Sequence, residues 1–346
     1  MTRSKISVLA VLAIAAVAVL VGFTTTRASH TAAAASVSGP AGALALQNNF
    51  VSVVHNVLPS VVQIETSSGL GSGIIFDNKG DIVTNDHVVG NATSFKVTTS
   101  SKAQAPLAGK LVGTFPEDDL AVIKVPSGGL KAATFADSSK LNVGDLAIAI
   151  GNPLGLTSSV TEGIVSALNR SEQEDTGVEL TNTIQTSAAI NPGNSGGALV
   201  DIYGRVIGIP TLAATDSELG TTASGIGFAI PSNVVKDIAS QIIKYGHVVD
   251  SHRPYLGVQI SDTNGTSGVY VSTVTPGGPA DKAGIKVGNV ITALNGSATP
   301  NSSVLTTVEA NLKPGQKVKV KIVREDGTAT TLSLTIGTYP GSTPAG

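Results

Sequence analysis

Short runs of β-branched and other apolar residues, bounded by glycine, proline or polar residues, dominate the chain between positions 60 and 230. Runs of this length at regular spacing are typical of an all-β barrel or sandwich, so we expect two successive sets of strands. The first set lies at residues 60–66, 72–77, 80–84, 94–99, 107–114 and 120–125. The second set lies at residues 145–150, 163–168, 181–186, 198–202, 206–210 and 227–230.

Apolar residues recur at helical spacing on either side of these strands. Residues 49–58 have this spacing, and residues 232–245 form an amphipathic pattern. Ser232 is placed to act as the N-cap of the second helix, and Gly246 is placed to end it. We therefore expect a helix at each end of a domain that covers residues 48–246.

A second, smaller domain follows a polar hinge at residues 247–254. Strand patterns here alternate with two short helical patterns. We expect strands at residues 255–261, 268–274 and 289–294, helices at 279–283 and 303–312, and a hairpin at 317–336. The domain is expected to cover residues 255–338, and residues 339–346 form a loose tail.

The first 23 residues form a targeting element. Arg3 and Lys5 precede residues 6–23, which carry no charge, so we expect the N-terminus to stay in the cytoplasm and the rest of the chain to lie outside it. The uncharged run exceeds the ~7–15 residues usual in a cleaved signal peptide and approaches the ~18–20 that span a bilayer. This length favours a membrane anchor over a signal peptide, although the small residues at 32–34 leave cleavage open. Residues 24–47, rich in Ala, Ser, Thr and Gly, are expected to be a flexible linker.

Composition excludes several classes of function. The 346 residues include no cysteine, which rules out disulfides, thiolate catalysis and cysteine-based zinc sites. The formal net charge is −2 and no Lys/Arg-rich block occurs, so a nucleic-acid partner is not expected. The five histidines are scattered without an HExxH motif, and no glycine-rich segment has nucleotide-binding spacing. We therefore expect neither a metal nor a cofactor.

Residues 185–197 place one serine, Ser195, among small residues and glycines. Gly193, Gly196 and Gly197 allow positive φ and let backbone N–H groups turn toward one point beside the hydroxyl. Acyl transfer requires this combination of a reachable nucleophile and N–H donors for a developing oxyanion. For this stretch alone, a glycine-rich turn with an incidental serine is the alternative.

His87 follows an apolar strand pattern, and Asp119 stands at the start of another. With Ser195 they give the chain order His, Asp, Ser. An imidazole with a pKa near ~6.5 can accept the serine proton at neutral pH, and a buried carboxylate would hold its tautomer. The sequence therefore predicts a catalytic triad.

Residues 193–197 also satisfy GxSxG, the nucleophile elbow of α/β-hydrolases. That fold requires a helix directly after the serine and an acid and histidine further along the chain. The residues after Ser195 instead predict a β-hairpin that turns at Tyr203 and Gly204, and alternating βα units are missing. We therefore reject the interpretation of residues 193–197 as the nucleophile elbow of an α/β-hydrolase.

Several motifs, in one order, resemble the HtrA (Deg) family of serine proteases. They lie at residues 84–89 (TNDHVV), 119–125 (DLAVIKV), 151–156 (GNPLGL), 160–167 (VTEGIVSA), 190–199 (INPGNSGGAL) and 225–233 (GIGFAIPSN). The resemblance extends over residues 49–337. It implies a mainly β fold, with a chymotrypsin-like pair of β-barrels and the active site between them.

The resemblance implies a role for each member of the triad. His87 would be the general base, Asp119 its orienting partner and Ser195 the nucleophile. Glu117 and Asp118 are adjacent carboxylates, and only the motif selects Asp119 over them.

The oxyanion hole and the substrate pocket follow from the same resemblance. The backbone N–H groups of Gly193, Asn194 and Ser195 would form the oxyanion hole. Ile226 and Phe228 are expected as pocket walls, and a purely structural role in the core is an equal alternative for both.

Two residues near the nucleophile depart from the family pattern. Ser187 stands where the family usually has aspartate, and Ala198 stands where proline is common. Neither belongs to the triad. We expect Ser187 to change how the loop before Ser195 is held.

The smaller domain resembles a PDZ domain, with further matches at residues 275–280 and 283–291, although Asn289 replaces the usual aspartate. Its carboxylate-binding loop would be Tyr255, Leu256, Gly257 and Val258. In such a loop successive N–H groups receive a peptide C-terminus, and the next strand binds the peptide by β-augmentation. A glycine-bearing turn is the alternative for these four residues alone. Arg253 either assists the carboxylate or is a solvated hinge residue.

The resemblance implies an ATP-independent serine endopeptidase of the cell envelope that cleaves unfolded or damaged proteins. The PDZ domain would bind C-terminal peptides and regulate cleavage, and the N-terminal helix would attach the chain to the membrane. Family members commonly form trimers, so we expect a homotrimer or a larger assembly, with residues near Phe50 at the interface. The alternative is a latent-protease chaperone or a peptide-binding scaffold.

Overall fold

The computed structural model describes residues 41–67, 69–101, 105–152, 159–173, 179–191, 193–216, 221–263, 265 and 267–341. Residues from Gln47 onward form one compact unit. The predicted targeting segment at 1–23 and most of the predicted linker at 24–47 lie outside the described residues. No helix within the described ranges is long and apolar enough to cross a membrane.

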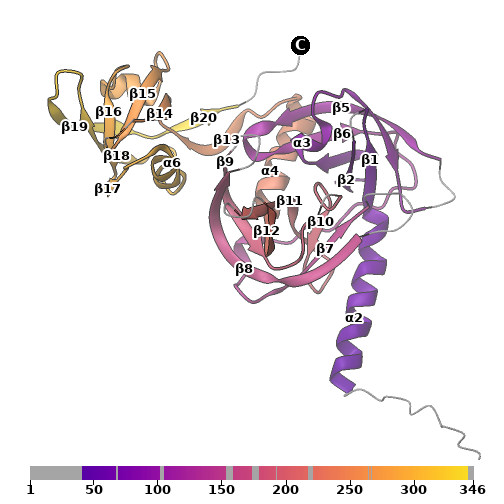
Figure 1. Cartoon of the computed structure of the whole chain (residues 1–346). Coiled ribbons are helices and arrows are strands. Elements are labelled where there is room, and N and C mark those ends of the chain that lie inside the picture. The colour runs from indigo at the N-terminus through magenta and orange to yellow at the C-terminus, as the bar shows by residue number, and fades with distance from the viewer. Residues whose placement is uncertain are drawn as a thin grey trace, which may run out of the picture. The chain divides into compact units, whose positions relative to one another are not determined.

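The first of two closed antiparallel barrels follows helix α2 (Ala41–Val57) and the 3₁₀ turn η1 (Leu58–Ser60) (Figure 1). Its strands are β1 (Val61–Glu65), β2 (Leu70–Ile75), β3 (Asp81–Thr84), β4 (Ser94–Thr98), β5 (Leu107–Phe115) and β6 (Leu120–Lys124). They close in the order β1-β2-β3-β6-β5-β4. The short helix α3 (Asp86–Val89) follows β3, and the 3₁₀ turn η2 (Pro116–Asp118) joins β5 to β6.

The second barrel begins after the 3₁₀ turn η3 (Ser138–Lys140) and closes in the order β10-β11-β12-β9-β8-β7. Its strands are β7 (Leu146–Gly151), β8 (Ser159–Gln173), β9 (Glu179–Thr186), β10 (Ala198–Val200), β11 (Val206–Asp216) and β12 (Thr221–Pro231). Helix α4 (Ser232–Tyr245) follows directly. The predicted two sets of strands are confirmed as two barrels.

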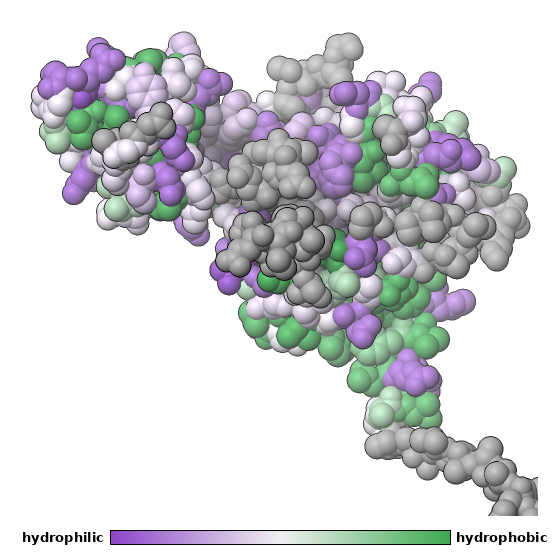
Figure 2. All heavy atoms as spheres, in the orientation of Figure 1, coloured by the Kyte–Doolittle hydropathy of each residue, from purple (hydrophilic) through white to green (hydrophobic). Residues whose placement is uncertain are grey.

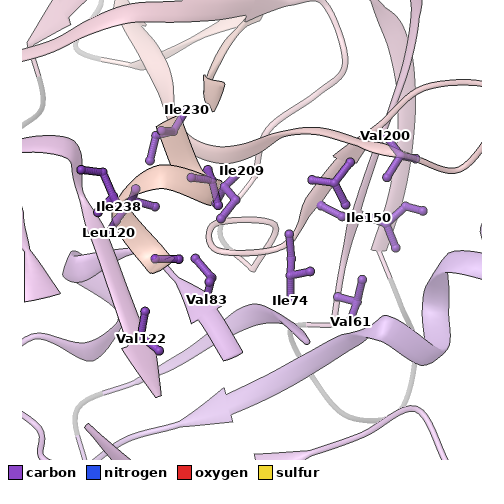
Figure 3. Close-up of a cluster of buried hydrophobic side chains, with 14 of the residues drawn as sticks. Val61, Ile74, Val83, Leu120, Val122, Ile150, Val200, Ile209, Ile230 and Ile238 are labelled. Carbon is purple, nitrogen blue, oxygen red and sulfur yellow. The ribbon is translucent and has the colours of Figure 1, made fainter. Parts of the chain in front are cut away.

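One buried cluster joins the two barrels and α4. Its central side chains are Val61, Ile74, Val83, Leu120, Val122, Ile150, Val200, Ile209, Ile230 and Ile238 (Figure 3). Alternate residues of each strand point inward, so the β-branched runs supply this cluster. Full burial of each such side chain contributes about 1.5–3 kcal/mol. The cluster therefore fixes one barrel against the other, which is what allows segments from both to form one site.

The smaller domain has its own core and a sheet in the order β14-β15-β16-β18-β19, with β17 paired to β16. Its elements are β14 (Val258–Asp262), β15 (Val269–Val274), α5 (Pro279–Ala283), β16 (Val290–Leu294), β17 (Ser297–Ala298), α6 (Ser302–Ala310), β18 (Lys317–Val323) and β19 (Ala329–Thr335). The predicted helix at 279–283 is confirmed with the same bounds.

Two predicted boundaries were wrong because pairing partners lie far apart in the chain. The hinge at 247–254 contains most of β13 (Asp250–Tyr255), which pairs with β20 (Gly337–Pro340). Strand β20 extends into the predicted tail, so Tyr339 belongs to an ordered ribbon. Neither segment is apolar enough to predict a strand by itself.

One helix start and one N-cap also differ from the prediction. Helix α2 begins at Ala41, so the last residues of the predicted linker are helical, in keeping with the high helix propensity of Ala and Leu. In α4 the N-cap is Pro231 rather than Ser232. The Ser232 hydroxyl donates instead to the carbonyl of Ala136, 3.0 Å away, so it serves a tertiary contact.

Candidate active site

Strand pairing in the first barrel brings His87 and Asp119 together. Strand β3 pairs with β6 with Thr84 opposite Ala121, so α3 after β3 lies beside the start of β6. The Nδ1 atom of His87 is 2.9 Å from Oδ2 of Asp119 and 3.0 Å from Oδ1. The backbone N–H of His87 also donates to Oδ1, at 3.0 Å. Because a carboxylate accepts, Nδ1 carries a proton, and in the neutral imidazole Nε2 is the basic nitrogen.

Asp119 is held for this contact by its backbone and by two neighbours. It has φ +48° and ψ +47°, a left-handed conformation that Asp tolerates better than most residues. Asn85 Nδ2 donates to the Asp119 carbonyl at 3.0 Å, and the Thr211 hydroxyl donates to Oδ2. The Asp119 side chain is 2% exposed and that of His87 33%, so solvent reaches the imidazole but not the carboxylate.

Ser195 lies in the turn before β10, in the second barrel. Its Oγ donates to the carbonyl of Thr211 at 3.1 Å, and the Thr211 side chain contacts Asp119. Thr211 therefore links Ser195 of one barrel to Asp119 of the other. Sequence reasoning missed Thr211 because it stands 92 positions from Asp119, without a motif of its own.

The segment between β9 and β10, residues 187–197, is called the nucleophile loop below, and the N–H groups beside Ser195 in it fall into two sets. Those of Asn194, Gly196 and Gly197 donate to the carbonyls of Asn191, Pro210 and Asn194, at 3.0, 3.1 and 2.9 Å. Those of Gly193 and Ser195 have no acceptor among the described residues. Two donors flanking a nucleophile suit an oxyanion. The prediction for Asn194 needs correction, since its N–H already closes the turn with Asn191.

The two departures from the family pattern are accommodated locally. The Ser187 hydroxyl accepts the N–H of Ile164 at 3.0 Å, and the Ser187 N–H donates to the Ile164 carbonyl at 3.1 Å. Both bonds tie the start of the nucleophile loop to β8. Ala198 is buried and pairs with Ile150 in β7.

The two predicted pocket residues differ in exposure. Ile226 is 38% exposed, whereas Phe228 is 2% exposed and pairs within the barrel with Gln185 and Leu212. The core alternative therefore fits Phe228. Ile190, which the sequence did not single out, approaches the backbone so closely that a Cβ at Gly227 would lie 2.4 Å from its Cγ1.

Three further carboxyls surround the His87–Asp119 pair. Burial and the nearby charge of Asp119 raise the pKa of Asp86 to about 6, against the opposing effect of His87. Burial also raises the pKa of Asp118, although Arg253 Nη1 lies 2.5 Å from its Oδ1. The same guanidinium donates to the Glu117 carbonyl. Arg253 thus binds the turn before Asp119 and is not a solvated hinge residue.

The carboxylate loop predicted for the smaller domain is a turn held by backbone hydrogen bonds. Gly257 has φ +81°, and the carbonyls of Leu256 and Gly257 accept N–H groups of Ala280 and Thr275, both at 2.9 Å. The N–H of Leu256, however, donates to Oε1 of Glu309 on α6 at 2.8 Å. A carboxylate of the chain itself therefore occupies one donor that a peptide C-terminus would use.

Two family models match the chain. Residues 71–209 match a trypsin-like peptidase domain, and residues 254–336 match a PDZ domain. These spans contain the His87–Asp119 pair with Ser195, and the Leu256 loop, respectively.

The chain is similar in sequence to bacterial proteins named as serine proteases. The periplasmic serine endoprotease DegP of Salmonella typhimurium is 44% identical over 276 residues, which cover 77% of this chain and 56% of the relative. The serine protease Do-like HtrA of Bacillus subtilis is 40% identical over 286 residues, 75% of this chain and 62% of the relative. The chain thus spans little more than half the length of these relatives.

Two solved protease structures match this chain over nearly their whole length. The HtrA-type protease AlgW with a decapeptide is 31% identical with a TM-score of 0.59, and the match covers 84% of this chain and 99% of AlgW. A serine endoprotease from Yersinia pestis is 33% identical with a TM-score of 0.58, over 84% of this chain and 98% of that one.

Proposed function

Because the chain belongs to the HtrA (Deg) family of serine proteases, we propose that it is an endopeptidase of the cell envelope acting through His87, Asp119 and Ser195. The observation that carries the proposal is the bonded His87–Asp119 pair, with Thr211 joining Asp119 to the nucleophile. Two flanking N–H groups without an acceptor among the described residues complete the arrangement.

The chemistry follows from these groups. Nε2 of His87 takes the proton of the Ser195 hydroxyl as Oγ bonds to the carbonyl carbon of the scissile peptide. The N–H groups of Gly193 and Ser195 stabilise the resulting oxyanion. The imidazolium, held by Asp119, then gives its proton to the leaving amine, and an acyl-enzyme remains. Water activated by the same imidazole hydrolyses the ester and restores Ser195.

Replacing the nucleophile tests the proposal. Ser195→Ala should lower kcat for casein or a peptide substrate by roughly 10⁴–10⁶ with thermal unfolding unchanged, since a triad acts as a unit. A fluorophosphonate should label the natural chain and leave the variant unlabelled. Unchanged casein cleavage by the variant would end the proposal. A natural chain that resists labelling with and without a C-terminal peptide would favour the latent-protease scaffold.

The substrates we propose are unfolded or damaged polypeptides, cleaved beside a pocket that Ile226 helps to form. The PDZ domain would bind free peptide C-termini at the Tyr255–Val258 backbone and so regulate cleavage. The PDZ match, together with the positive φ of Gly257, supports this role.

We further propose that the chain assembles as a homotrimer or larger oligomer and lies outside the cytoplasm, as the names of its periplasmic relatives suggest. Leu44, Leu46 and Val51 of α2 are 55%, 47% and 62% exposed, and Figure 2 shows hydrophobic residues along this helix. An apolar helix surface of this kind suits contact with another copy. Anchoring through residues 6–23 remains a prediction from the sequence.

A further inference from the structure

Ser72 belongs to the first barrel, yet its hydrogen bonds reach the nucleophile loop of the second. It lies in the middle of β2, pairs with Gln63 of β1 and is fully buried. Its N–H donates to the carbonyl of Ser195 at 3.1 Å. Its hydroxyl donates to the carbonyl of Gly193 at 2.5 Å. One residue therefore holds the loop at two points, on either side of Asn194.

The Ser72 hydroxyl is also fixed by its other partners. It accepts the backbone N–H of Asn152, which follows β7, at 2.8 Å. The Ser72 carbonyl accepts the Thr84 hydroxyl at 2.6 Å. Asn152 and Thr84 are both buried, so water cannot readily replace these bonds. The hydroxyl thus stands between three segments: β2, the end of β7 and the nucleophile loop.

These bonds determine the orientation of two peptide planes. The Gly193 carbonyl and the Asn194 N–H share one plane, and Ser72 Oγ and the Asn191 carbonyl hold its two ends. The Ser195 carbonyl and the Gly196 N–H share another plane. The Ser72 N–H and the Pro210 carbonyl hold its two ends.

The two donors proposed for the oxyanion lie next to these fixed planes. The N–H of Ser195 and the carbonyl of Asn194 share the peptide plane that lies between these two planes. The Asn194 carbonyl accepts the N–H of Gly197. Gly193, with φ +107°, sets the direction of its own N–H relative to the first plane. Each peptide plane is rigid and shares one Cα with the next, so the two planes held by Ser72 limit the rotation of the Asn194–Ser195 plane between them and of the plane that carries the Gly193 N–H.

Close packing shows how little freedom remains around this contact. A Cβ added to Gly196 would lie 2.2 Å from the Ser72 carbonyl oxygen. A Cβ added to Gly151 would lie 2.5 Å from the Gly193 carbonyl oxygen that Ser72 holds. Neither Gly196 in the nucleophile loop nor Gly151 at the end of β7 therefore has room for a side chain.

We propose that Ser72 is a positioning residue for catalysis, whose hydroxyl orients the Gly193 and Ser195 N–H groups toward the oxyanion. It acts through the nucleophile loop and does not contact substrate. The inference rests on the proposed protease function of this site. It adds a contribution of the first barrel that is separate from His87 and Asp119.

The test compares Ser72→Ala with Ser232→Ala as a matched control. Both serines are fully buried, and each donates its hydroxyl to a backbone carbonyl. Ser72→Ala should lower kcat for a peptide substrate by about 10- to 100-fold, as expected for misplaced catalytic groups, with KM changed less than about threefold. Ser232→Ala should keep the natural kcat. Ser72→Thr, which retains the hydroxyl, should recover most of the lost activity.

Two further measurements separate positioning from other effects. The acid limb of the pH profile should stay in place in Ser72→Ala, because the His87–Asp119 pair is intact. Amide hydrogen exchange, followed by mass spectrometry on fragments that contain Ser195, should be faster in Ser72→Ala and unchanged in Ser232→Ala. This second measurement does not require turnover.

Each outcome decides the question. Slower turnover with faster exchange around Ser195, both reversed by threonine, supports the inference. Natural kcat and exchange in Ser72→Ala would overturn it, as would equal losses in the alanine and threonine variants or an alanine variant that no longer folds. A natural chain that neither cleaves nor reacts with a fluorophosphonate would refute the proposed function. The exchange comparison would still decide whether Ser72 holds the loop.

Discussion

The nucleophile loop and the carboxylate loop of the PDZ domain face the same physical task in different ways. Each is a glycine-containing turn with backbone N–H groups suited to a negatively charged oxygen. In the nucleophile loop, neutral hydrogen bonds from Ser72 hold the carbonyls, and the Gly193 and Ser195 donors have no acceptor among the described residues. In the carboxylate loop, the Leu256 donor is bonded to Glu309.

The difference shows that one fold can leave the donors of one proposed anion site unbonded among the described residues and pair a donor of the other with an internal carboxylate. The oxyanion exists only during the reaction, so its donors must be oriented in advance and cannot be paired inside the protein. A peptide carboxylate is a stable ligand, and it must displace the Glu309 carboxylate or bind beside its charge. If the PDZ domain binds peptides at this loop, as proposed, Glu309 is an internal competitor for the Leu256 N–H.

The largest effect should come from changing the backbone at Gly193, whose N–H is a proposed oxyanion donor. Its φ of +107° is unfavourable for any residue with a Cβ, so Gly193→Ala should turn its N–H away and lower kcat by about 10²–10³. Steady-state kinetics on a peptide substrate measure the loss. Gly144→Ala is the matched control, with φ +100° and open space for a Cβ. Similar kcat values for the two variants would count against Gly193 as an oxyanion donor.

The second-largest effect should come from removing the charge of Glu309, which contacts the carboxylate loop of the PDZ domain. Glu309→Gln removes the competing charge and should tighten binding of a peptide with a free C-terminus by about tenfold, or about 1.4 kcal/mol. Fluorescence anisotropy with a labelled peptide measures the affinity, and the same peptide with an amidated C-terminus should show no gain. Glu325→Gln, an exposed charge on the turn between β18 and β19, should leave the affinity unchanged. Equal affinities of the natural chain and Glu309→Gln would refute the competitor role.

The smallest effect concerns the charge beside the imidazole. The pKa of Asp86 is raised to about 6, so Asp86 is ionised above that pH and favours the protonated form of His87. Asp86→Asn should therefore move the acid limb of kcat/KM to lower pH, by about half a unit. A pH profile between 4.5 and 8.5 measures this shift. Glu65→Gln, which removes an exposed partner of Lys96, should not move it.

The dependence of thermal stability on pH gives Asp86→Asn a second, independent test. The folded-state pKa of Asp86 lies above its ordinary value of 3.8, so ionisation costs folding free energy above pH 6, and this cost disappears as pH falls toward 3.8. Asp86→Asn should raise Tm by about 2–4 °C at pH 8, allowing for partial exposure of the group, and should not raise it at pH 4. A uniform change in Tm across this range would show that packing, not charge, is responsible.

The sequence alone determined the parts of this protein that depend on local pattern. Alternating β-branched runs predicted the strands of both barrels, and α4 and α5 were predicted with the bounds the structure has. The proposed triad of His87, Asp119 and Ser195 was predicted from residue type, from the place of these residues at strand ends and from the surrounding motifs. Local periodicity and chain order suffice for these features, because each reports on a short segment.

Only the tertiary structure decided which distant groups hold that site. Thr211 reaches Asp119 across 92 positions, Ser72 reaches Gly193 across 121, and Glu309 reaches Leu256 across 53. Strands β13 and β20, from opposite ends of the smaller domain, pair for the same reason. Hydrogen-bond partners of this kind are set by the register in which strands pair and by the packing of one barrel on the other. A serine between two glycines, or a glutamate near a helix end, carries no local mark of the carbonyl or N–H group that it will meet.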